Sequence, residues 1–317
     1  MVLLDSSSAS DYCTISTKGS YVEADRKKAA KNLKWAWRTC CHFERLNVTS
    51  SQMDAWFEDA PLMVAIAHIA FTQSPEVLQR ITDIKAGLAG MDLLVAESAQ
   101  QTNVALNLAG GIPQVSQNPL WWFRTLDRRR AIAVSQNSVV FYDADYDRFD
   151  TFLDQVKKTS RLVAEIGGAG CFLTAVALRY ISGFASNGAP TPYICAGLHG
   201  IPVESLKTSH FHHEYSFWCD VDSGGKLVVK LKTVHGNQLI PQDILATGLA
   251  LDPKFSLSKE FDAVQLDIYE TLQKKAMERL SVGEIEQILS GMRNNIKAAF
   301  FAATTERAHE RWKRTSK

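Results

Sequence analysis

The densest group of possible metal ligands is the cluster from His210 to Glu214, with His235 further along the chain. In an extended segment His210 and His212 lie on one face, and His213 lies on the other. Two imidazoles on one face can hold a divalent metal when a third ligand joins them, such as His235 or a carboxylate. A polar loop before a hairpin explains the same residues without a metal. Because no third ligand lies nearby in the sequence, we expect no metal and no other cofactor.

A second group of functional candidates is the basic turn Arg128, Arg129 and Arg130, with Arg124 across the predicted hairpin. Guanidinium groups form paired hydrogen bonds with phosphate, so these side chains could contact nucleic acid. A solvated hairpin tip is the simpler interpretation, and we prefer it. Arg179 differs from these four, because it lies inside an apolar segment. A buried guanidinium needs a partner, which predicts a structural ion pair.

No recognisable catalytic motif occurs in the chain. The acidic run Asp143, Asp145, Asp147 and Asp150 lacks the glycine and the final glutamate of a calcium loop, and it suits the start of a helix instead. The glycine-rich residues 167–170 follow a predicted helix, which is the wrong order for a phosphate-binding loop. A G-x-S-x-G nucleophile motif is absent. We therefore expect no catalytic residues.

The composition indicates a folded globular protein. The 317 residues are 46% hydrophobic and 22% charged, and the net charge is +1, which argues against a nucleic-acid footprint along the whole chain. None of the six cysteines forms a C-x-x-C pair, which favours reduced thiols in a reducing compartment. The sequence contains no apolar run of 18 residues and no secretory signal. We predict a cytoplasmic protein without a membrane partner.

Residues 23–46 are predicted to form a basic amphipathic helix. Its apolar stripe consists of Ala29, Leu33, Ala36, Cys40 and Phe43. The opposite face carries four basic residues, and two tryptophans flank the stripe: Lys27, Lys31, Lys34, Arg38, Trp35 and Trp37. Three interpretations stay open, namely packing on the chain's own domain, docking to a partner or second copy, and nucleic-acid binding. Because tryptophan is a favoured interface residue, we predict that this helix is the main partner-binding surface.

Periodicity predicts a chain of alternating strands and helices. The expected strands are 62–71, 91–96, 121–126, 130–134, 139–142, 172–181, 213–221, 226–233 and 261–269. The expected helices are 75–89, 147–166 and 282–312, and residues 98–119 are expected to be largely irregular. This order indicates an α+β protein with a ferredoxin-like or related split βαβ layer. A second β-sheet and long-helix half follows it, and a helical extension precedes it.

The domain organisation is predicted from a Gly/Ser/Asn/Pro-rich stretch at residues 182–192. Residues 1–55 are a flexible tail and the basic helix. Residues 56–184 form the first α+β half, and residues 185–317 form the second, which ends in a long helix. The most apolar strand-like segments predict one central sheet that contains Val64, Ile66, Ile69, Val176, Leu178 and Tyr180.

Several short segments resemble a sporadically distributed, uncharacterised family of bacterial proteins that is often linked to mobile elements. These segments are Asp59–Ala65, Trp122–Asp127, Val176–Ile181, Leu266–Tyr269 and Phe300–Ala308. The resemblance covers about residues 55–312. Ser182 departs from the pattern, because relatives tend to carry Asn there, and the basic helix looks like an added extension. The resemblance implies a bacterial origin but no established activity and no catalytic residues.

Three functions remain in view from the sequence. The leading hypothesis is a non-enzymatic protein-binding or assembly subunit of a bacterial system linked to mobile elements or defence. The alternative is a nucleic-acid-binding protein that uses the basic helix and the arginine-rich turn. The third is a metal-dependent enzyme that uses the His210–Glu214 cluster. Salt dependence of binding separates the first two, because phosphate contacts weaken steeply with salt.

Overall fold

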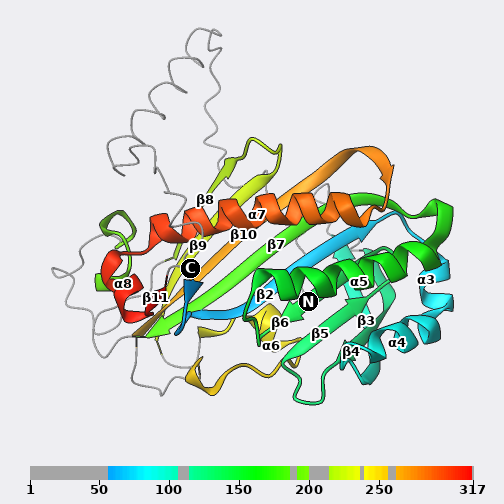
Figure 1. Ribbon diagram of the computed structural model, residues 1–317, viewed down its shortest axis with the longest axis horizontal. Helices are drawn as coiled ribbons and strands as arrows, with labels where there is room; N and C mark the ends of the chain where they lie inside the picture. Colours follow the sequence, from blue (N-terminus) through cyan, green and yellow to red (C-terminus); the bar gives the residue numbers. More distant parts are fainter. Residues whose placement is uncertain are drawn as a thin grey trace, which may run out of the picture.

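The computed structural model is dominated by one large antiparallel sheet with helices against it (Figure 1). The structure describes residues 56–105, 114–185, 191–199, 214–235, 239–255 and 262–315. Within these residues nine strands form a single sheet in the order β3-β4-β5-β6-β2-β7-β10-β9-β8. A separate pair, β1 and β11, joins the two ends of the described chain.

The elements have the following bounds. The strands are β1 Trp56–Phe57, β2 Leu62–Phe71, β3 Val95–Ala105, β4 Gln114–Arg124, β5 Arg130–Val134, β6 Ser138–Asp143, β7 Phe172–Ala185, β8 Glu214–Asp220, β9 Lys226–His235, β10 Asp262–Arg279 and β11 Arg314–Thr315. The helices are α3 Pro75–Gln79, α4 Ile81–Ala89, α5 Phe149–Gly167, α6 Gln242–Leu245, α7 Val282–Ala303 and α8 Glu306–Arg311. No helix among the described residues is long and apolar enough to span a membrane.

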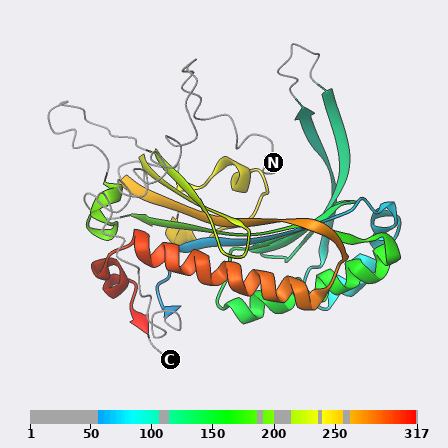
Figure 2. The same ribbon diagram turned by 90° about the horizontal axis from the view of Figure 1, so that it is seen from above.

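The longer helices cover one face of the sheet, as Figure 2 shows for α5 and α7. In α5 the buried residues Phe152, Val156 and Val163 recur at helical spacing, so the helix packs one stripe onto the strands. The opposite face is covered in part by the segment 239–255, whose Leu239, Ile244 and Phe255 are buried against it. The main core therefore lies between the sheet and its helices.

The predicted ferredoxin-like split βαβ layer is wrong. Every strand pair in the described sheet is antiparallel, so the expected parallel crossover does not form. The expected second sheet is also wrong, because β10 pairs with β7 and continues the same sheet. The predicted N-terminal helical extension lies outside the described residues.

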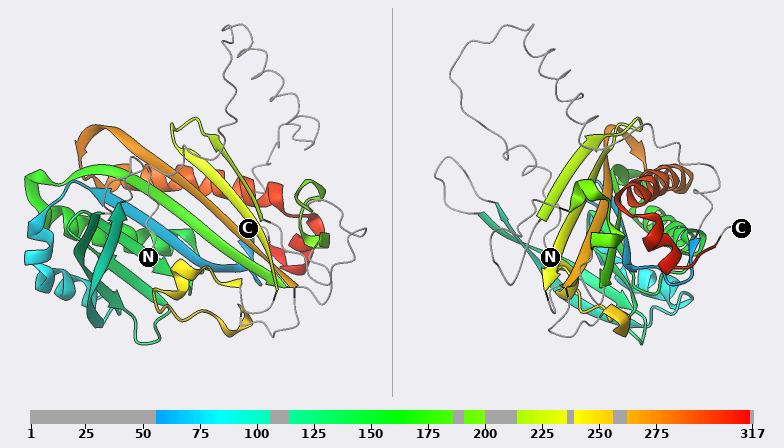
Figure 3. Two further views of the ribbon diagram at one scale, coloured as in Figure 1. Left: turned by 180° about the vertical axis from the view of Figure 1, so that it is seen from behind. Right: turned by 90° about the vertical axis from the view of Figure 1, so that its left-hand side faces the viewer.

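The expected irregular connection at 98–119 is replaced by a long hairpin of β3 and β4. These strands pair from Val95 with Arg124 to Ala105 with Gln114. The outer part of the hairpin projects from the sheet in Figures 2 and 3. Residues 98–100 and 117–119 of this hairpin are exposed or half-buried, and the sequence of the hairpin lacks the apolar alternation that predicts a strand.

The other predicted elements are largely confirmed. Strand 62–71 has the expected bounds, the meander and the hairpin at 214–235 are present, and α5 corresponds to helix 147–166. The strand expected near 261–269 continues to Arg279, and the long C-terminal helix is interrupted between α7 and α8. The central-sheet prediction is confirmed, since its six residues lie on the adjacent strands β2 and β7, and five of them are buried.

Candidate ligand-binding pocket

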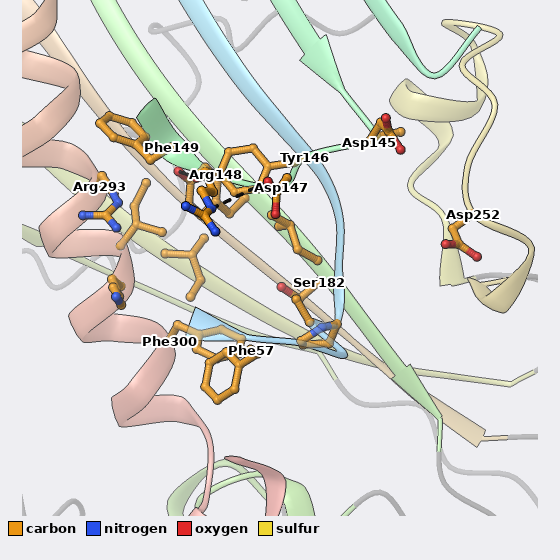
Figure 4. A pocket seen from close by; sticks show the side chains of 18 of the residues that line it. Phe57, Asp145, Tyr146, Asp147, Arg148, Phe149, Ser182, Asp252, Arg293 and Phe300 are labelled. Carbon is orange, nitrogen blue, oxygen red and sulfur yellow. Dashed lines mark hydrogen bonds and ion pairs between the residues drawn. The ribbon is translucent and has the colours of Figure 1, made fainter. Parts of the chain in front are cut away.

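A cavity of about 480 Å³ opens at one end of the helix-covered face (Figure 4). Its walls come from α7, the start of α5, the loop between β6 and α5, the start of β2, and the segment 252–255. Pockets that bury small ligands typically have volumes of about 300–1,000 Å³. The cavity is therefore large enough for a small organic molecule.

Aromatic and aliphatic side chains form the floor of the cavity. The two-stranded β1–β11 pairing holds Phe57 beside α7, with ring centroids 6.0 Å from Phe300 and 5.8 Å from Phe301. Ile268 of β10 and Ile296 of α7 add aliphatic surface. These residues come from segments far apart in the sequence, and together they give the cavity an apolar interior.

Two tyrosine hydroxyl groups meet at the cavity wall. Tyr146 follows β6, Tyr180 lies on β7, and their hydroxyl oxygens are 2.9 Å apart. Burial raises the pKa of Tyr146 to about 12 and that of Tyr180 well above its ordinary value. Both hydroxyls therefore keep their protons near neutral pH, so the pair presents neutral polar groups to the cavity.

Ser182 lies two residues beyond Tyr180 on the same face of β7 and also lines the cavity. Gly183, the residue after Ser182, faces the other side of the sheet, because a Cβ atom placed there would lie 2.8 Å from the sulfur of Met63 and 2.9 Å from Leu239. Ser182 is buried, and its short side chain leaves the cavity open at this point.

Charged side chains surround the mouth. Arg129 binds Asp145 at 2.7 Å and Asp252 at 3.5 Å, so it partly neutralises two carboxylates on one side. Arg148 lies 3.7 Å from Asp147 at the start of α5. Figure 4 shows Arg148 and Arg293 on the opposite side of the cavity from Asp252. Each side of the opening thus carries at least one arginine beside a carboxylate.

Arg293 lies on α7 with its guanidinium carbon 5.1 Å from the centre of the Phe149 ring. It is half-buried, and it makes no ion pair within the part of the chain that the structure describes. Lys297, one turn further along α7, lines the same wall. The α7 side of the cavity is therefore cationic.

The predicted arginine group is divided by the structure. Arg124 is buried, stacks 4.3 Å from the Trp122 ring centre and binds Glu97 at 3.1 Å, and Arg128 binds the other oxygen of Glu97 at 2.9 Å. Arg129 turns toward the cavity, and Arg130 lies near the carboxylate of Asp143. Three of the four guanidiniums are thus engaged by carboxylates, and a nucleic-acid role for them stays a prediction.

The predicted partner and metal residues fall largely outside the described residues. Those residues are Trp35, Trp37, Lys27, Lys31, Lys34, Arg38, His210 and His212. Only the backbone of His235 is described, at the end of β9 opposite Asp262. In the described ranges no group of three metal-ligating side chains is close enough to hold an ion.

The structural ion pair predicted for Arg179 is present. Its Nε and Nη2 atoms donate to the two carboxylate oxygens of Asp267, both at 2.8 Å, and Asp243 supplies a second carboxylate. Of the acidic run, only Asp150 lies in the first turn of α5, which begins at Phe149, whereas Asp143 is the buried last residue of β6.

Sequence reasoning did not identify Arg293, Tyr146, Tyr180 or Ser182 as site residues. The position of Arg293 was one available signal. It directly follows Met292, which belongs to the buried stripe of α7, so its charged side chain starts at the edge of the face that packs on the sheet. No protein-family model matches this chain, and no curated protein is recognisably similar to it in sequence. The functional argument therefore depends on the chemistry of the cavity.

Proposed function

We propose that this chain is a non-enzymatic binding protein that holds a small amphipathic ligand in the cavity between α5 and α7. The observation that carries the proposal is the combination of a 480 Å³ cavity, an apolar floor and a few polar groups at its wall. Such a combination is typical of ligand-binding sites, in which apolar surface supplies affinity and polar groups fix orientation.

Binding is favoured over catalysis by the titratable groups of the cavity. Its described lining contains neither histidine nor cysteine, the side chains that most often supply a base or a nucleophile near neutral pH. The raised pKa values of Tyr146 and Tyr180 lie far from neutrality. Ser182 has no neighbouring base among these residues that could activate it. The lining is thus suited to hydrogen bonding.

The segments of the family resemblance give the proposal further support. Four of the five contribute to the cavity lining, namely Asp59–Ala65, Val176–Ile181, Leu266–Tyr269 and Phe300–Ala308. We retain membership of that bacterial family as a proposal. We also retain the proposal that residues 23–46 dock to a partner. The ligand-binding chain would then act as one subunit of an assembly.

Filling the cavity tests the proposal. Ser182→Phe adds a ring where the chain has a short side chain, whereas Ser182→Ala removes the hydroxyl without reducing the space. Two fluorescent probes should be titrated, the neutral dye Nile red and the anionic anilinonaphthalene sulfonate. We expect at least one probe to bind the wild-type protein and the Ala variant alike, with affinity at least tenfold weaker in the Phe variant. Equal binding to all three proteins, or binding to none, would contradict the proposal. Circular dichroism checks that the Phe variant is folded.

A further inference from the structure

We infer that the ligand of this cavity is an organic acid, whose carboxylate is held beside Arg293 while its apolar body lies on the phenylalanine floor. This inference rests on the proposed function and adds the chemical class of the ligand. It is carried by two groups in the cavity wall that have hydrogen-bond donors without an acceptor among the described residues.

The first group is the guanidinium of Arg293. It is half-buried against Phe149, and a partly desolvated guanidinium is costly unless an acceptor satisfies it. The neighbouring arginines already have carboxylates, since Arg129 binds Asp145 and Asp252 and Arg148 lies beside Asp147. Arg293 has none among the described residues. A planar carboxylate matches the fork of guanidinium donors, so the ligand would supply the missing acceptor.

The second group is the tyrosine pair. Two hydroxyls carry two protons, and the contact between Tyr146 and Tyr180 uses only one of them. The other proton has no acceptor among the described residues, although both side chains are at the cavity wall. Arg293 is close enough to both tyrosines to influence their ionisation. One carboxylate could therefore accept from the free hydroxyl and from the guanidinium.

Carboxylates of the protein limit where an acid can lie. Glu58 and Asp150 are exposed at the mouth, and Asp147 lies beside Arg148. Their repulsion disfavours an anion at the entrance and favours one that reaches the α7 side. The apolar floor at Phe57 and Phe300 then remains available for the body of the ligand.

The test compares two ligands of one shape, naphthalene-2-acetate and its neutral amide, by calorimetric titration of the full chain. We expect the wild-type protein to bind the acid at least tenfold more tightly than the amide, since a hydrogen bond to a charged group is worth about tenfold or more in affinity. Arg293→Gln should remove this preference, Arg293→Lys should keep part of it, and Tyr146→Phe should reduce it. Arg161→Gln, on the exposed side of α5, is the matched control and should behave as the wild type.

Several outcomes would overturn the inference. If the acid and the amide bind equally to the wild type and both are weakened by Ser182→Phe, the cavity binds ligands without selecting anions, so the proposed function survives and this inference fails. If neither compound binds and neither fluorescent probe responds to Ser182→Phe, both fail. Tighter binding of 2-naphthyl phosphate than of the acid would overturn the assignment of a carboxylate.

Discussion

His68 lies in the middle of β2, between Val140 of β6 and Ala177 of β7. Its Nε2 atom is buried and has no hydrogen-bond partner among the described residues. Burial disfavours the charged imidazolium and lowers the pKa of His68 from 6.5 to about 4. At neutral pH this half-buried side chain is therefore uncharged.

The lowered pKa of His68 predicts acid sensitivity. Between pH 6.5 and about 4 the unfolded chain binds a proton at this residue that the folded chain does not bind. The free energy of unfolding therefore decreases as the pH falls through this range. His68→Leu cannot be protonated. From pH 7 to pH 4.5 we expect the wild type to lose about 2 kcal/mol more unfolding free energy than this variant, measured by urea denaturation. The same pH dependence in both proteins would contradict this account.

Single residues also show what the sequence could and could not reveal about the site. An arginine inside the apolar strand Phe172–Ala185 predicted a carboxylate partner, and Arg179 has one. Its identity could not be predicted, because Asp267 is 88 positions away and only strand pairing brings it near. The same limitation hid the cavity, whose Tyr146, Tyr180 and Arg293 come from a loop, a strand and a helix.

At the scale of elements, local signals predicted those that pack an apolar face and missed those that do not. α5 has a regular buried stripe, β2 is buried along most of its length, and both were predicted closely. The hairpin of β3 and β4 was missed. Where it leaves the core, it is defined by the backbone pairing of the two strands with each other, which local sequence does not reveal. The polar end of β10, residues 270–279, was missed for a related reason, since most of its side chains are not buried.

The break between α7 and α8 gives a prediction at this scale. Periodicity predicted one helix over 282–312, but Thr304 and Thr305 are extended, and Thr305 caps the new helix that begins at Glu306. The Thr305 hydroxyl accepts from the Ala308 amide at 3.3 Å and donates to the carbonyl of Pro192 at 2.7 Å. Thr305→Ala removes both bonds and should lower the unfolding free energy by about 1–2 kcal/mol.

Thr305→Ser keeps the hydroxyl and is the matched control for this cap. We expect its urea midpoint to lie close to that of the wild type. If Thr305→Ala and Thr305→Ser are equally stable, the hydroxyl is not what separates the two helices. The break would then follow from the packing of Phe301 and Trp312 around Phe57.

The whole molecule joins the two predicted halves through one sheet. β7, from the first half, lies between β2 and β10, and β10 belongs to the second. Such pairings link residues about 80–110 positions apart, for example Ala175 with Gln273. Local periodicity carries no information about partners at that distance, which is why the strand order could not be predicted although most strands were.

The shared sheet predicts that residues 56–184 do not fold alone. Cutting the chain after residue 184 would leave β7 without β10 along nearly its whole length. It would also remove α7, whose Ile285, Leu289, Met292 and Ile296 are buried in the core cluster that contains Val176 and Leu178. Burial of each such side chain contributes about 2 kcal/mol to the free energy of unfolding. Losing these four contributions together with the pairing of β7 and β10 would remove more free energy than an ordinary domain has in reserve.

Two measurements examine this expectation. Expressed alone, the fragment 56–184 should show no cooperative urea transition, whereas co-expression with residues 185–317 should yield a complex that unfolds in one step by both circular dichroism and tryptophan fluorescence. The co-expressed pair is the control, because it contains every residue of 56–317 and lacks one peptide bond. A cooperative transition and a dispersed NMR spectrum from the isolated fragment would show instead that the first half is an independent domain. In that case the apolar faces of β2 and β7 would have to be covered by α3, α4 and α5 without α7.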